Sequence, residues 1–368
     1  MSNAAVCPRL TFESVRVRAV SVPLRRPLVA KVGNFEKWPF VLIDVQTREG
    51  VVGRSYLEPY VASSVRYVAG AIEDLASRLA GKPLAPLDAF RDNNGALHLL
   101  GRQGISVIAT AGLDMAIWDA FARAAGLPLC VLLGGTTGKV RAYNTNGLWL
   151  IPLDRLEAEA ASLVAEGGFD AIKLRLGRPT LQDDLDAIAA ARRGAGKDIK
   201  LMVDFNQGLA YGEAMLRLQA LDDQGLYWFE EPVVFDNYEG SARLARELKT
   251  PVQIGENIYG PREFYKAVTA QAADLYMPDL MRIGGVTGWM RSAAIAGAAG
   301  APLSSHLYPI VSSHLLRVSE TADWLEASDW ATPILATPLE VKDGYAIVPD
   351  TPGSGIDWNE EAVKRLAL

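Results

Sequence analysis

Two patterns of apolar and polar residues follow one another in the first third of the chain. From about residue 10 to 60 the two types alternate, as in VRVRAVSVPL and PFVLIDVQTREGVVGRSYL. This alternation predicts an antiparallel β-meander with a turn at TREG. From about residue 62 to 125 the spacing becomes helical and ends in ISVIATAGLDMAIWDAFARAAG. Strands followed by helices favour a separate α+β domain over residues 1–135.

From about residue 140 short apolar runs alternate with helical segments. This alternation is typical of an α/β fold in which parallel strands form a TIM-like barrel, here expected over residues 136–332. The final segment, residues 333–368, is strand-like and rich in turns, so we expect it to return to the first domain and complete it. The eight strand candidates of the barrel are VRAYNTNG, FDAIKLRLG, KLMVDFN, LYWFEEP, VQIGEN, DLYMPDL, PLSSHL and DWLE.

The composition is that of an ordinary globular protein, with 49% hydrophobic and 22% charged residues among 368. A net charge of −6 gives no basic surface for nucleic acid or an anionic membrane. Charges or prolines interrupt the long apolar stretches, and the first residues lack a signal-peptide pattern, so neither a membrane helix nor secretion is expected. With only Cys7 and Cys130, no disulfide framework is implied, which fits a reducing cytoplasm.

Three carboxylates recur at one interval, each at the end of an apolar run. Asp204 closes KLMVDFN, Glu230 closes LYWFE 26 residues later, and Glu256 closes VQIGE after another 26. That interval fits one strand–helix unit, which would place all three at the mouth of the barrel. A single acid there could be a helix cap or a surface charge. Three together, without thiolates or clustered imidazoles, predict a site for a hard divalent cation such as Mg²⁺.

Lys173 and Arg175 lie two residues apart in AIKLRLG, the second strand candidate. This spacing puts both side chains on one face of a strand. They could simply solvate the strand end. A cation pair that faces three acids and a metal would instead bind a substrate carboxylate and stabilise the charge that develops on it.

Asp279 and His306 end the sixth and seventh strand candidates. Adjacent strand ends come within hydrogen-bond reach, so the aspartate could orient the imidazole as a general base. We interpret the other two histidines, His98 and His314, as structural. Glu326 ends the eighth candidate, where it could cap a helix or, if protonated, donate a hydrogen bond to a carboxylate.

The motifs KxR, VDFNQ, FEEP, GEN, MPD, IGGVTGW and SSHL occur in this order over nearly the whole chain, which resembles the mandelate racemase group of the enolase superfamily, within the mandelate racemase/muconate lactonizing enzyme family. The resemblance implies an α+β capping domain on a (β/α)₇β barrel, often in octamers, and removal of a proton alpha to a carboxylate. It also implies roles for single residues. Asp204, Glu230 and Glu256 would bind Mg²⁺. Asn206 and Glu231 would be nearby polar support, and Asn206 would also lie near the substrate. Asp279 and His306 would form the catalytic dyad, and Lys173 and Glu326 would contact the two oxygens of the substrate carboxylate.

One position departs from the mandelate racemase pattern. That pattern has KxK, in which the second lysine is the base on one face of the substrate, whereas this chain has Arg175. A guanidinium keeps its proton to above about pH 12 and is a poor general base. Racemisation needs a base on each face, so Arg175 argues against it. Dehydration of an acid sugar needs only His306, first as base and then as acid for the departing hydroxyl.

The capping-domain loop favours a different substrate. Leu28, Val32 and Phe35, with Tyr60 in the next covering segment, would surround an apolar or aromatic group better than a polyol. Alternatively, this loop packs on its own domain. Lys31 and Glu58 add charge nearby and could bind hydroxyl groups. In the first barrel strand the family motif SxS is Thr145-Asn146-Gly147, and Gly147 lacks a hydroxyl that contacts substrate, which argues against mandelate itself.

These features together predict Mg²⁺-assisted abstraction of the alpha proton of a 2-hydroxycarboxylate. We place a racemase or epimerase ahead, because the resemblance and the apolar cap outweigh one substitution. An aldonate or aldarate dehydratase that uses the Asp279–His306 dyad is the first alternative. The second is a metal-binding barrel that has lost catalysis, which the intact dyad and acid triad oppose. A homo-oligomer is expected, without a readable interface.

Overall fold

The computed structural model describes residues 9–368. Residues 1–8, among them Cys7 and the start of the segment without a signal-peptide pattern, lie outside the described part. The chain then opens with the strands β1 (Phe12–Ala30), β2 (Gly33–Thr47) and β3 (Val52–Leu57), which form one antiparallel sheet in that order. Gly50 has a φ of +82° in the turn between β2 and β3. The β-meander and its TREG turn are confirmed.

The helices α1 (Val65–Ser77), α2 (Pro86–Ala96) and α3 (Ile105–Ala125), with short 3₁₀ turns at Ala62–Ser64 and His98–Leu100, follow the sheet. The long helix α3 packs so tightly on it that a Cβ at Gly53 would lie 2.0 Å from the carbonyl oxygen of Ala116. By length and composition alone α3 could cross a membrane, but 72% of its most apolar window is buried inside the protein. This is the burial of a core helix.

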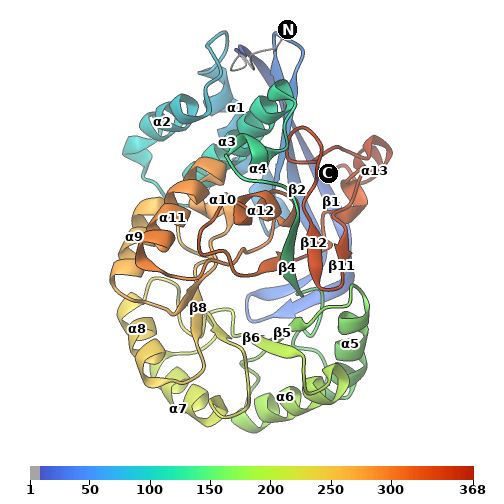
Figure 1. Ribbon diagram of the computed structural model, residues 1–368, viewed down its shortest axis with the longest axis vertical. Helices are drawn as coiled ribbons and strands as arrows, with labels where there is room; N and C mark the ends of the chain where they lie inside the picture. Colours follow the sequence, from blue (N-terminus) through green and yellow to red (C-terminus); the bar gives the residue numbers. More distant parts are fainter. Residues whose placement is uncertain (1–8) are drawn as a thin grey trace.

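The eight apolar runs predicted for the barrel lie side by side in chain order and close into a ring (Figure 1). The strands are β4 (Lys139–Asn144), β5 (Ala171–Arg175), β6 (Lys200–Asp204), β7 (Phe229–Glu230), β8 (Val252–Ile254), β9 (Leu275–Tyr276) and β10 (Leu325–Ala327). All pair in parallel with their neighbours, and β10 closes the ring against β4. The carboxyl ends therefore open at one mouth.

The seventh run, PLSSHL, joins the barrel through single parallel bridges rather than a regular strand. Leu303 bridges Tyr276 and Ala322, and His306 bridges Asp279. The helices of the barrel are α5 (Leu153–Ala165), α6 (Leu181–Ala195), α7 (Tyr211–Leu221), α8 (Tyr238–Glu247), α9 (Gly260–Thr269), α10 (Leu280–Ile283), α11 (Gly285–Ala299) and α12 (Pro309–Leu316), with α4 (Leu129–Leu132) before the first strand. Together these elements form a capping domain on a (β/α)₇β barrel, as expected.

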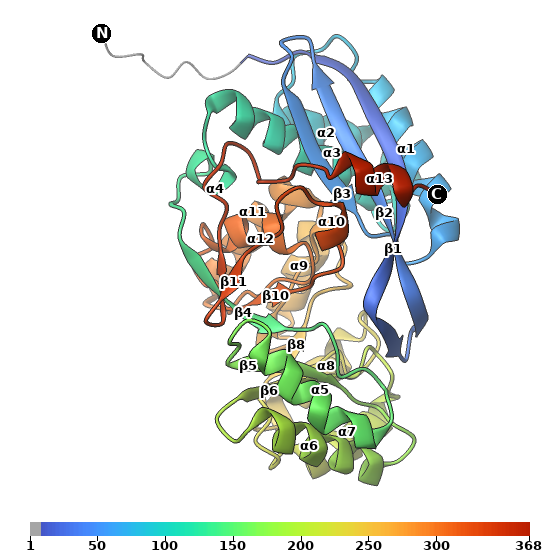
Figure 2. The ribbon, with the colours of Figure 1, turned by 90° about the vertical axis from the view of Figure 1, so that its right-hand side faces the viewer.

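The C-terminal segment contacts both domains. A 3₁₀ turn at Thr332–Ile334 precedes β11 (Val341–Lys342) and β12 (Tyr345–Ile347), and β12 pairs antiparallel with the first half of β4, where β10 leaves the edge free. Beyond it, the Trp358 indole donates to Asp44 of β2, and α13 (Glu360–Arg365) lies beside the sheet (Figure 2). The boundaries at 1–135, 136–332 and 333–368 stay predictions.

The β1–β2 hairpin extends from the cap down to the barrel (Figure 2). Arg25 and Arg26 near its tip form ion pairs with Glu166 at the end of α5. The Lys31 side chain lies over two glycines: a Cβ at Gly208 would be 2.7 Å from Lys31 Cγ, and one at Gly177 would be 3.2 Å from Lys31 Cε. Lys31 therefore docks the hairpin on the barrel.

A second joint between the domains explains the motif IGGVTGW. Asp114 of α3 accepts hydrogen bonds from the backbone N–H (2.8 Å) and the hydroxyl (2.6 Å) of Thr287, at the start of α11. A carboxylate there satisfies free N–H groups of the helix terminus. Gly285 has a φ of +71°, and a Cβ at this position would lie 2.7 Å from Asp114 Oδ2. Only glycine permits this close approach.

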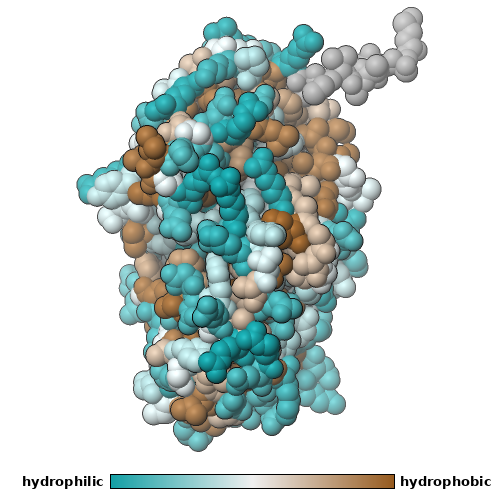
Figure 3. Space-filling view, turned by 90° about the vertical axis from the view of Figure 1, so that its left-hand side faces the viewer, coloured by the Kyte–Doolittle hydropathy of each residue, from teal (hydrophilic) through white to brown (hydrophobic). Residues whose placement is uncertain are grey.

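The face of the molecule in Figure 3 is mostly hydrophilic, with apolar side chains scattered over it. The described residues include a few strongly exposed leucines, such as Leu99 at 96% and Leu100 at 81% exposure, between α2 and α3. Scattered exposed apolar residues are normal on a soluble surface and identify no interface. The octamer implied by the family resemblance therefore stays a prediction.

His314 is buried on α12 and joins three parts of the chain. Its Nδ1 accepts the backbone N–H of Cys130 (3.3 Å), which leaves Nε2 to donate to the Ser354 carbonyl (3.2 Å). Burial lowers the pKa of His314 to about 4. The structural role expected for it is consistent with these contacts, since both ring nitrogens bond backbone groups.

We expect His314 to make the fold sensitive to acid. Its unfolded pKa is about 6.5, so below that pH the unfolded chain takes up the proton first, and stability is lost as the pH falls from about 6.5 to about 4. The loss should approach about 3 kcal/mol. Urea unfolding of the wild type and His314→Gln at pH 8, 6, 5 and 4 measures it, with the exposed His98→Asn as control. Equal pH slopes for the wild type and His314→Gln would contradict the assignment.

Candidate active site and metal centre

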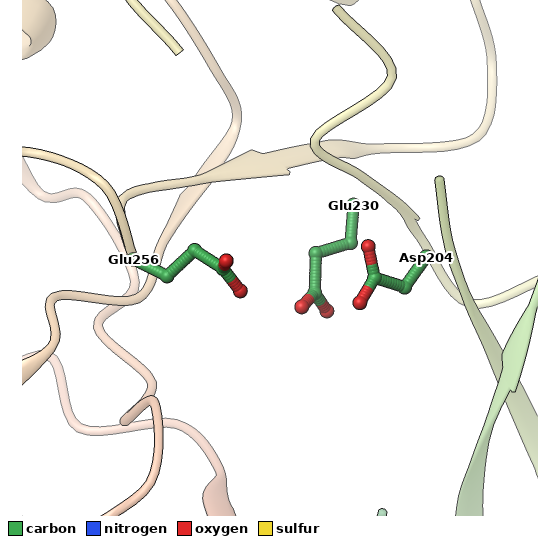
Figure 4. A group of neighbouring side chains, drawn as sticks. All are labelled: Asp204, Glu230 and Glu256. Atoms are coloured by element: carbon green, nitrogen blue, oxygen red, sulfur yellow. The ribbon is translucent and has the colours of Figure 1, made fainter. Parts of the chain in front are cut away.

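Three carboxylates meet at the carboxyl ends of adjacent barrel strands. Asp204 ends β6, Glu230 ends β7, and Glu256 follows β8; they are 1%, 0% and 9% exposed. One oxygen of each lies within 4.8 Å of the others. Figure 4 shows Asp204 and Glu230 side by side, with Glu256 pointing toward them from the other side. The repeated 26-residue spacing predicted this cluster.

The cluster fits Mg²⁺. Its donors are all carboxylate oxygens, which a hard divalent cation prefers, and their buried negative charges require a cation nearby. Burial and the neighbouring acids Asp204, Glu326 and Glu256 raise the pKa of Glu230 to about 8, although Lys173 opposes the shift. Asn206 donates through its backbone and side chain to Asp204, at 2.7 and 2.9 Å. These bonds hold the Asp204 carboxylate in place.

Lys173 of β5 already neutralises part of this charge. Its Nζ lies 2.7 Å from both Glu230 Oε1 and Glu326 Oε1 and 3.7 Å from Asp204 Oδ2. Burial opposes the ammonium, but these carboxylates hold its pKa above the ordinary value. Burial also opposes ionisation of Glu326, yet Lys173 and His306 keep its pKa low. Glu326 is an acceptor in this arrangement, so its expected role as a protonated donor stays a prediction.

His306 forms the expected pair with Asp279. His306 Nδ1 lies 2.7 Å from Asp279 Oδ2, and Asp279 Oδ1 accepts the backbone N–H of Arg282. Because the carboxylate is the acceptor, Nδ1 carries a hydrogen and Nε2 is left facing Glu256 Oε2 at 3.2 Å. Burial lowers the pKa of His306, but the carboxylates of Glu256, Glu326 and Asp279 raise it to about 10.

A cavity of about 240 Å³ opens beside these groups. The residues predicted to cover the substrate, Leu28, Val32, Phe35 and Tyr60, all line it, together with Asn206, Lys173, Arg175, Asp204, Glu256, His306 and Glu326. Val32 is 61% exposed and contributes only to the rim. Glu230 and Asp279 lie behind the lining, where they contact Lys173 and His306.

The lining also includes residues that were not recognised from the sequence, among them three tryptophans and Arg282. Trp38 of β2, Trp149 after β4 and Trp330 after β10 form an aromatic row, with ring centroids 4.8 Å apart for Trp38–Trp330 and 6.2 Å for Trp149–Trp330. Arg282 of α10 donates to the Tyr60 hydroxyl (2.7 Å) and to the Glu256 carbonyl (3.0 Å). Trp149 and Trp330 each follow the end of a barrel strand, and this position in the sequence could have identified them as residues of the active-site mouth.

Two residues that were expected to offer polar contacts lie elsewhere. Glu58 is behind Trp38 and accepts its indole N–H at 2.8 Å, and burial raises the pKa of Glu58 to about 8. Lys31 lies over Gly177 and Gly208 on the barrel and does not line the cavity. The wall of the cavity on the side of the cap is therefore mainly apolar.

Backbone strain gathers at this mouth. Non-glycine residues with positive φ include Asn206 (+44°) and Gln207 (+61°) after β6, Glu231 (+37°) after β7, Leu307 (+49°) after His306, and Tyr60 (+64°) in the cap. Such conformations are costly for L-residues and cluster at functional sites, where the surroundings hold them. The strain supports this mouth as the active site.

Comparisons with known proteins agree with the site. Residues 13–134 match the N-terminal domain model of mandelate racemase and muconate lactonizing enzyme, and residues 155–362 match the model of the enolase C-terminal domain-like family. The chain belongs to the mandelate racemase/muconate lactonizing enzyme family of the enolase superfamily. The L-talarate/galactarate dehydratase of Salmonella typhimurium LT2 is 31% identical over 95% of this chain and 90% of its own.

Two solved structures of this family are particularly similar. An enolase from alpha proteobacterium bal199 with bound magnesium is 52% identical, with a TM-score of 0.96 over 98% of this chain and 100% of that one. An enolase from Bradyrhizobium in complex with magnesium and mandelic acid is 41% identical, with a TM-score of 0.94 over 99% and 100%. This chain is therefore a Mg²⁺-dependent enzyme whose relatives include dehydratases and racemases, and its cofactor site is Asp204, Glu230 and Glu256.

Replacing one of these carboxylates should weaken Mg²⁺ binding without lowering the stability of the metal-free protein. Mg²⁺ at about 100 times its Kd should stabilise the wild type by about 2.7 kcal/mol. Asp204→Asn should lose most of this gain, while its metal-free form stays as stable as the wild type, because one of the repelling charges is gone. Thermal unfolding in MgCl₂ and in EDTA measures both effects. Asp223→Asn, with a side chain that is 80% exposed, is the control; an undiminished Mg²⁺ shift in Asp204→Asn would contradict the site.

Proposed function

We propose that the enzyme abstracts the alpha proton of a small 2-hydroxycarboxylate with His306 as base, and that the reaction is dehydration of a 2,3-dihydroxycarboxylate. One observation carries this proposal. Among the described residues that line the cavity, His306 carries the only imidazole, and Asp279 fixes its ring at 2.7 Å. Bound Mg²⁺ would oppose the negative charge of Glu256 that raises the pKa of His306, which would leave Nε2 able to accept a proton. A single base is sufficient for dehydration but not for efficient racemisation.

Each lining residue then has one task. Bound Mg²⁺ supplies positive charge where negative charge develops on the substrate carboxylate. Lys173 and Arg175 hold that carboxylate, and Glu326 keeps Lys173 in place. His306 Nε2 takes the proton from C2, while Asp279 stabilises the imidazolium. The same Nε2–H then passes the proton to the hydroxyl on C3; the C3–O bond breaks, water leaves, and the resulting enol becomes a 2-keto-3-deoxy acid.

The opposite face of the substrate lacks an equivalent base. Arg175 donates to the Thr145 hydroxyl (2.9 Å), and its guanidinium lies 4.0 Å from the Trp149 ring centroid. A guanidinium binds anions well but is a poor acceptor of protons. Lys173 is held charged by its two carboxylates. This geometry favours dehydration over the racemase or epimerase that the sequence placed first.

Racemisation is the second candidate function, supported by one specific observation. The Bradyrhizobium relative was solved with mandelic acid, which has no hydroxyl on C3 to eliminate. In a racemase, Arg175 would have to return the proton on the second face. A barrel without catalysis has less support, because the dyad and the acid cluster are complete.

The cavity also supports a preference for the substituent. Its far wall is the row Trp149–Trp330–Trp38, with Phe35 and Tyr60 packed edge-on against Trp38 at 5.4 and 5.2 Å. Glu58 holds the Trp38 indole by its N–H. Hydroxyl groups facing Trp38 and Phe35 would lack partners, so an apolar or aromatic group beyond C3 fits better than a polyol chain.

Membership in the mandelate racemase group, a homo-oligomeric assembly such as an octamer, and a cytoplasmic location are parts of the same proposal. They rest on the family resemblance and on the absence of a disulfide framework in the sequence. Light scattering coupled to size exclusion measures the assembly directly.

The reaction outcome can be read by NMR. In D₂O with Mg²⁺, aromatic 2-hydroxy acids, 2,3-dihydroxy acids with apolar substituents, and aldonic or aldaric acids should be compared. We expect a 2-keto-3-deoxy acid from a dihydroxy acid, and a rate about 10²–10⁴-fold lower in His306→Gln. Asp279→Asn should also slow the reaction. Deuterium entering C2 with inversion, without keto acid, would replace dehydration by racemisation.

Arg175→Lys tests the second face directly. A lysine can lose its proton more readily than an arginine, so this variant should exchange the alpha proton on both faces of a bound 2-hydroxy acid faster than the wild type. The rate of deuterium entry into each enantiomer of mandelate measures this. Arg193→Lys on the exposed face of α6 is the matched control. No gain on the second face would count against the view that Arg175 blocks racemisation.

A further inference from the structure

Arg175 and Trp149 are adjacent residues of the cavity lining that carry buried hydrogen-bond donors. They are 4% and 2% exposed, both line the cavity, and the guanidinium carbon lies 4.0 Å from the indole centroid. Three of their N–H groups have no acceptor among the described residues: Nε and NH1 of Arg175, and Nε1 of Trp149. Arg175 Nε lies 3.6 Å from Asp204 Oδ2, and this distance is too long for a hydrogen bond.

Unpartnered donors of this kind are rare in folded proteins. Each buried N–H without an acceptor costs free energy, and native structures leave few of them. Three of them on two touching residues of the cavity lining, which also includes Lys173, match a ligand that brings several acceptor oxygens and a negative charge. A carboxylate has that chemistry.

The loop after β4 is built to present Trp149 to the cavity. Gly147 cannot face the cavity with a side chain, because a Cβ there would lie 2.6 Å from Glu159 Oε1, which accepts the Leu148 N–H at 2.6 Å. Leu148 has a φ of +52° and is fully buried, and its carbonyl accepts the Arg175 backbone N–H at 2.9 Å. The strained turn therefore ties the loop to β5 and sets the indole over the guanidinium.

We propose that Trp149 is a specificity-determining residue whose indole N–H donates to the substrate carboxylate, side by side with Arg175. The residue takes over a contact that Gly147 cannot make. The Arg175 guanidinium carbon lies 4.0 Å from the Trp149 ring centroid, so in the proposed complex both side chains donate to oxygens of one carboxylate. This inference rests on the proposed function for the identity of the ligand as a carboxylic acid, but it concerns binding and needs no turnover.

The test compares two acids with and without the indole N–H. Trp149→Phe keeps an aromatic ring beneath Arg175 and removes only the donor and part of the ring area. Calorimetric titration of the Mg²⁺-loaded enzyme with mandelate and with phenylacetate, which lacks the 2-hydroxyl, should show about a tenfold or larger loss of affinity for both, as expected for a hydrogen bond to a charged group. Trp330→Phe, a neighbour in the same aromatic row without a buried unpartnered N–H, should lose much less.

A spectroscopic measurement separates a direct contact from a packing effect. In protein labelled with ¹⁵N-indole tryptophan, the resonance missing from Trp149→Phe identifies Trp149, and its proton should move downfield when phenylacetate binds. A loss of affinity for mandelate alone would assign the N–H to the 2-hydroxyl and overturn the proposal. So would equal losses in the two tryptophan variants, an unmoved indole resonance, or no binding of either acid to the wild type. These experiments measure binding and not turnover. They therefore test the contact between Trp149 and the carboxylate even if the enzyme does not catalyse the proposed dehydration.

Discussion

The arrangement depends on balancing negative charge buried at one end of a barrel. Asp204, Glu230, Glu256 and Glu326 are nearly inaccessible to solvent, and such carboxylates are tolerated only with cations among them. Lys173 supplies one charge between Glu230 and Glu326, and Mg²⁺ supplies two more. The same charges that hold the metal thus hold the lysine that is placed to meet a substrate carboxylate. Catalytic electrostatics and local stability share one set of groups.

The capping domain forms one wall of the cavity over this charged mouth. The hairpin is pinned by the Arg25 and Arg26 ion pairs with Glu166, and Asp114 bonds the start of α11. Both contacts hold the capping domain in position over the carboxyl ends of the barrel strands. In the proposed complex the aromatic wall keeps water from one side of the substrate, which strengthens each electrostatic interaction on the other side. The same wall would thus set the preference for the substituent and strengthen the electrostatic interactions at the reacting carbon.

Two departures from the family pattern follow the first two barrel strands: Gly147 lies after β4, and Arg175 ends β5. The dyad, the acid cluster and Lys173 match the shared pattern, and in the proposed function they remove the alpha proton. Arg175, stacked on Trp149 and bonded to Thr145, alters the next chemical step, because a guanidinium binds anions well and accepts protons poorly. In the proposed function, the outcome of proton abstraction therefore depends on these side chains beside β5 rather than on the metal centre.

The sequence by itself determined the barrel, the acid cluster and the dyad. Parallel strands in chain order must bring their carboxyl ends together, so the 26-residue spacing of Asp204, Glu230 and Glu256 already implied their proximity. Only the tertiary structure decided the aromatic wall and the pairing of β12 with β4. Trp38, Trp149 and Trp330 meet from three distant parts of the chain, through a strained turn at Leu148 and the docking of the cap. The periodicity of apolar residues in the sequence does not predict such contacts, because they depend on how whole secondary-structure elements pack against one another.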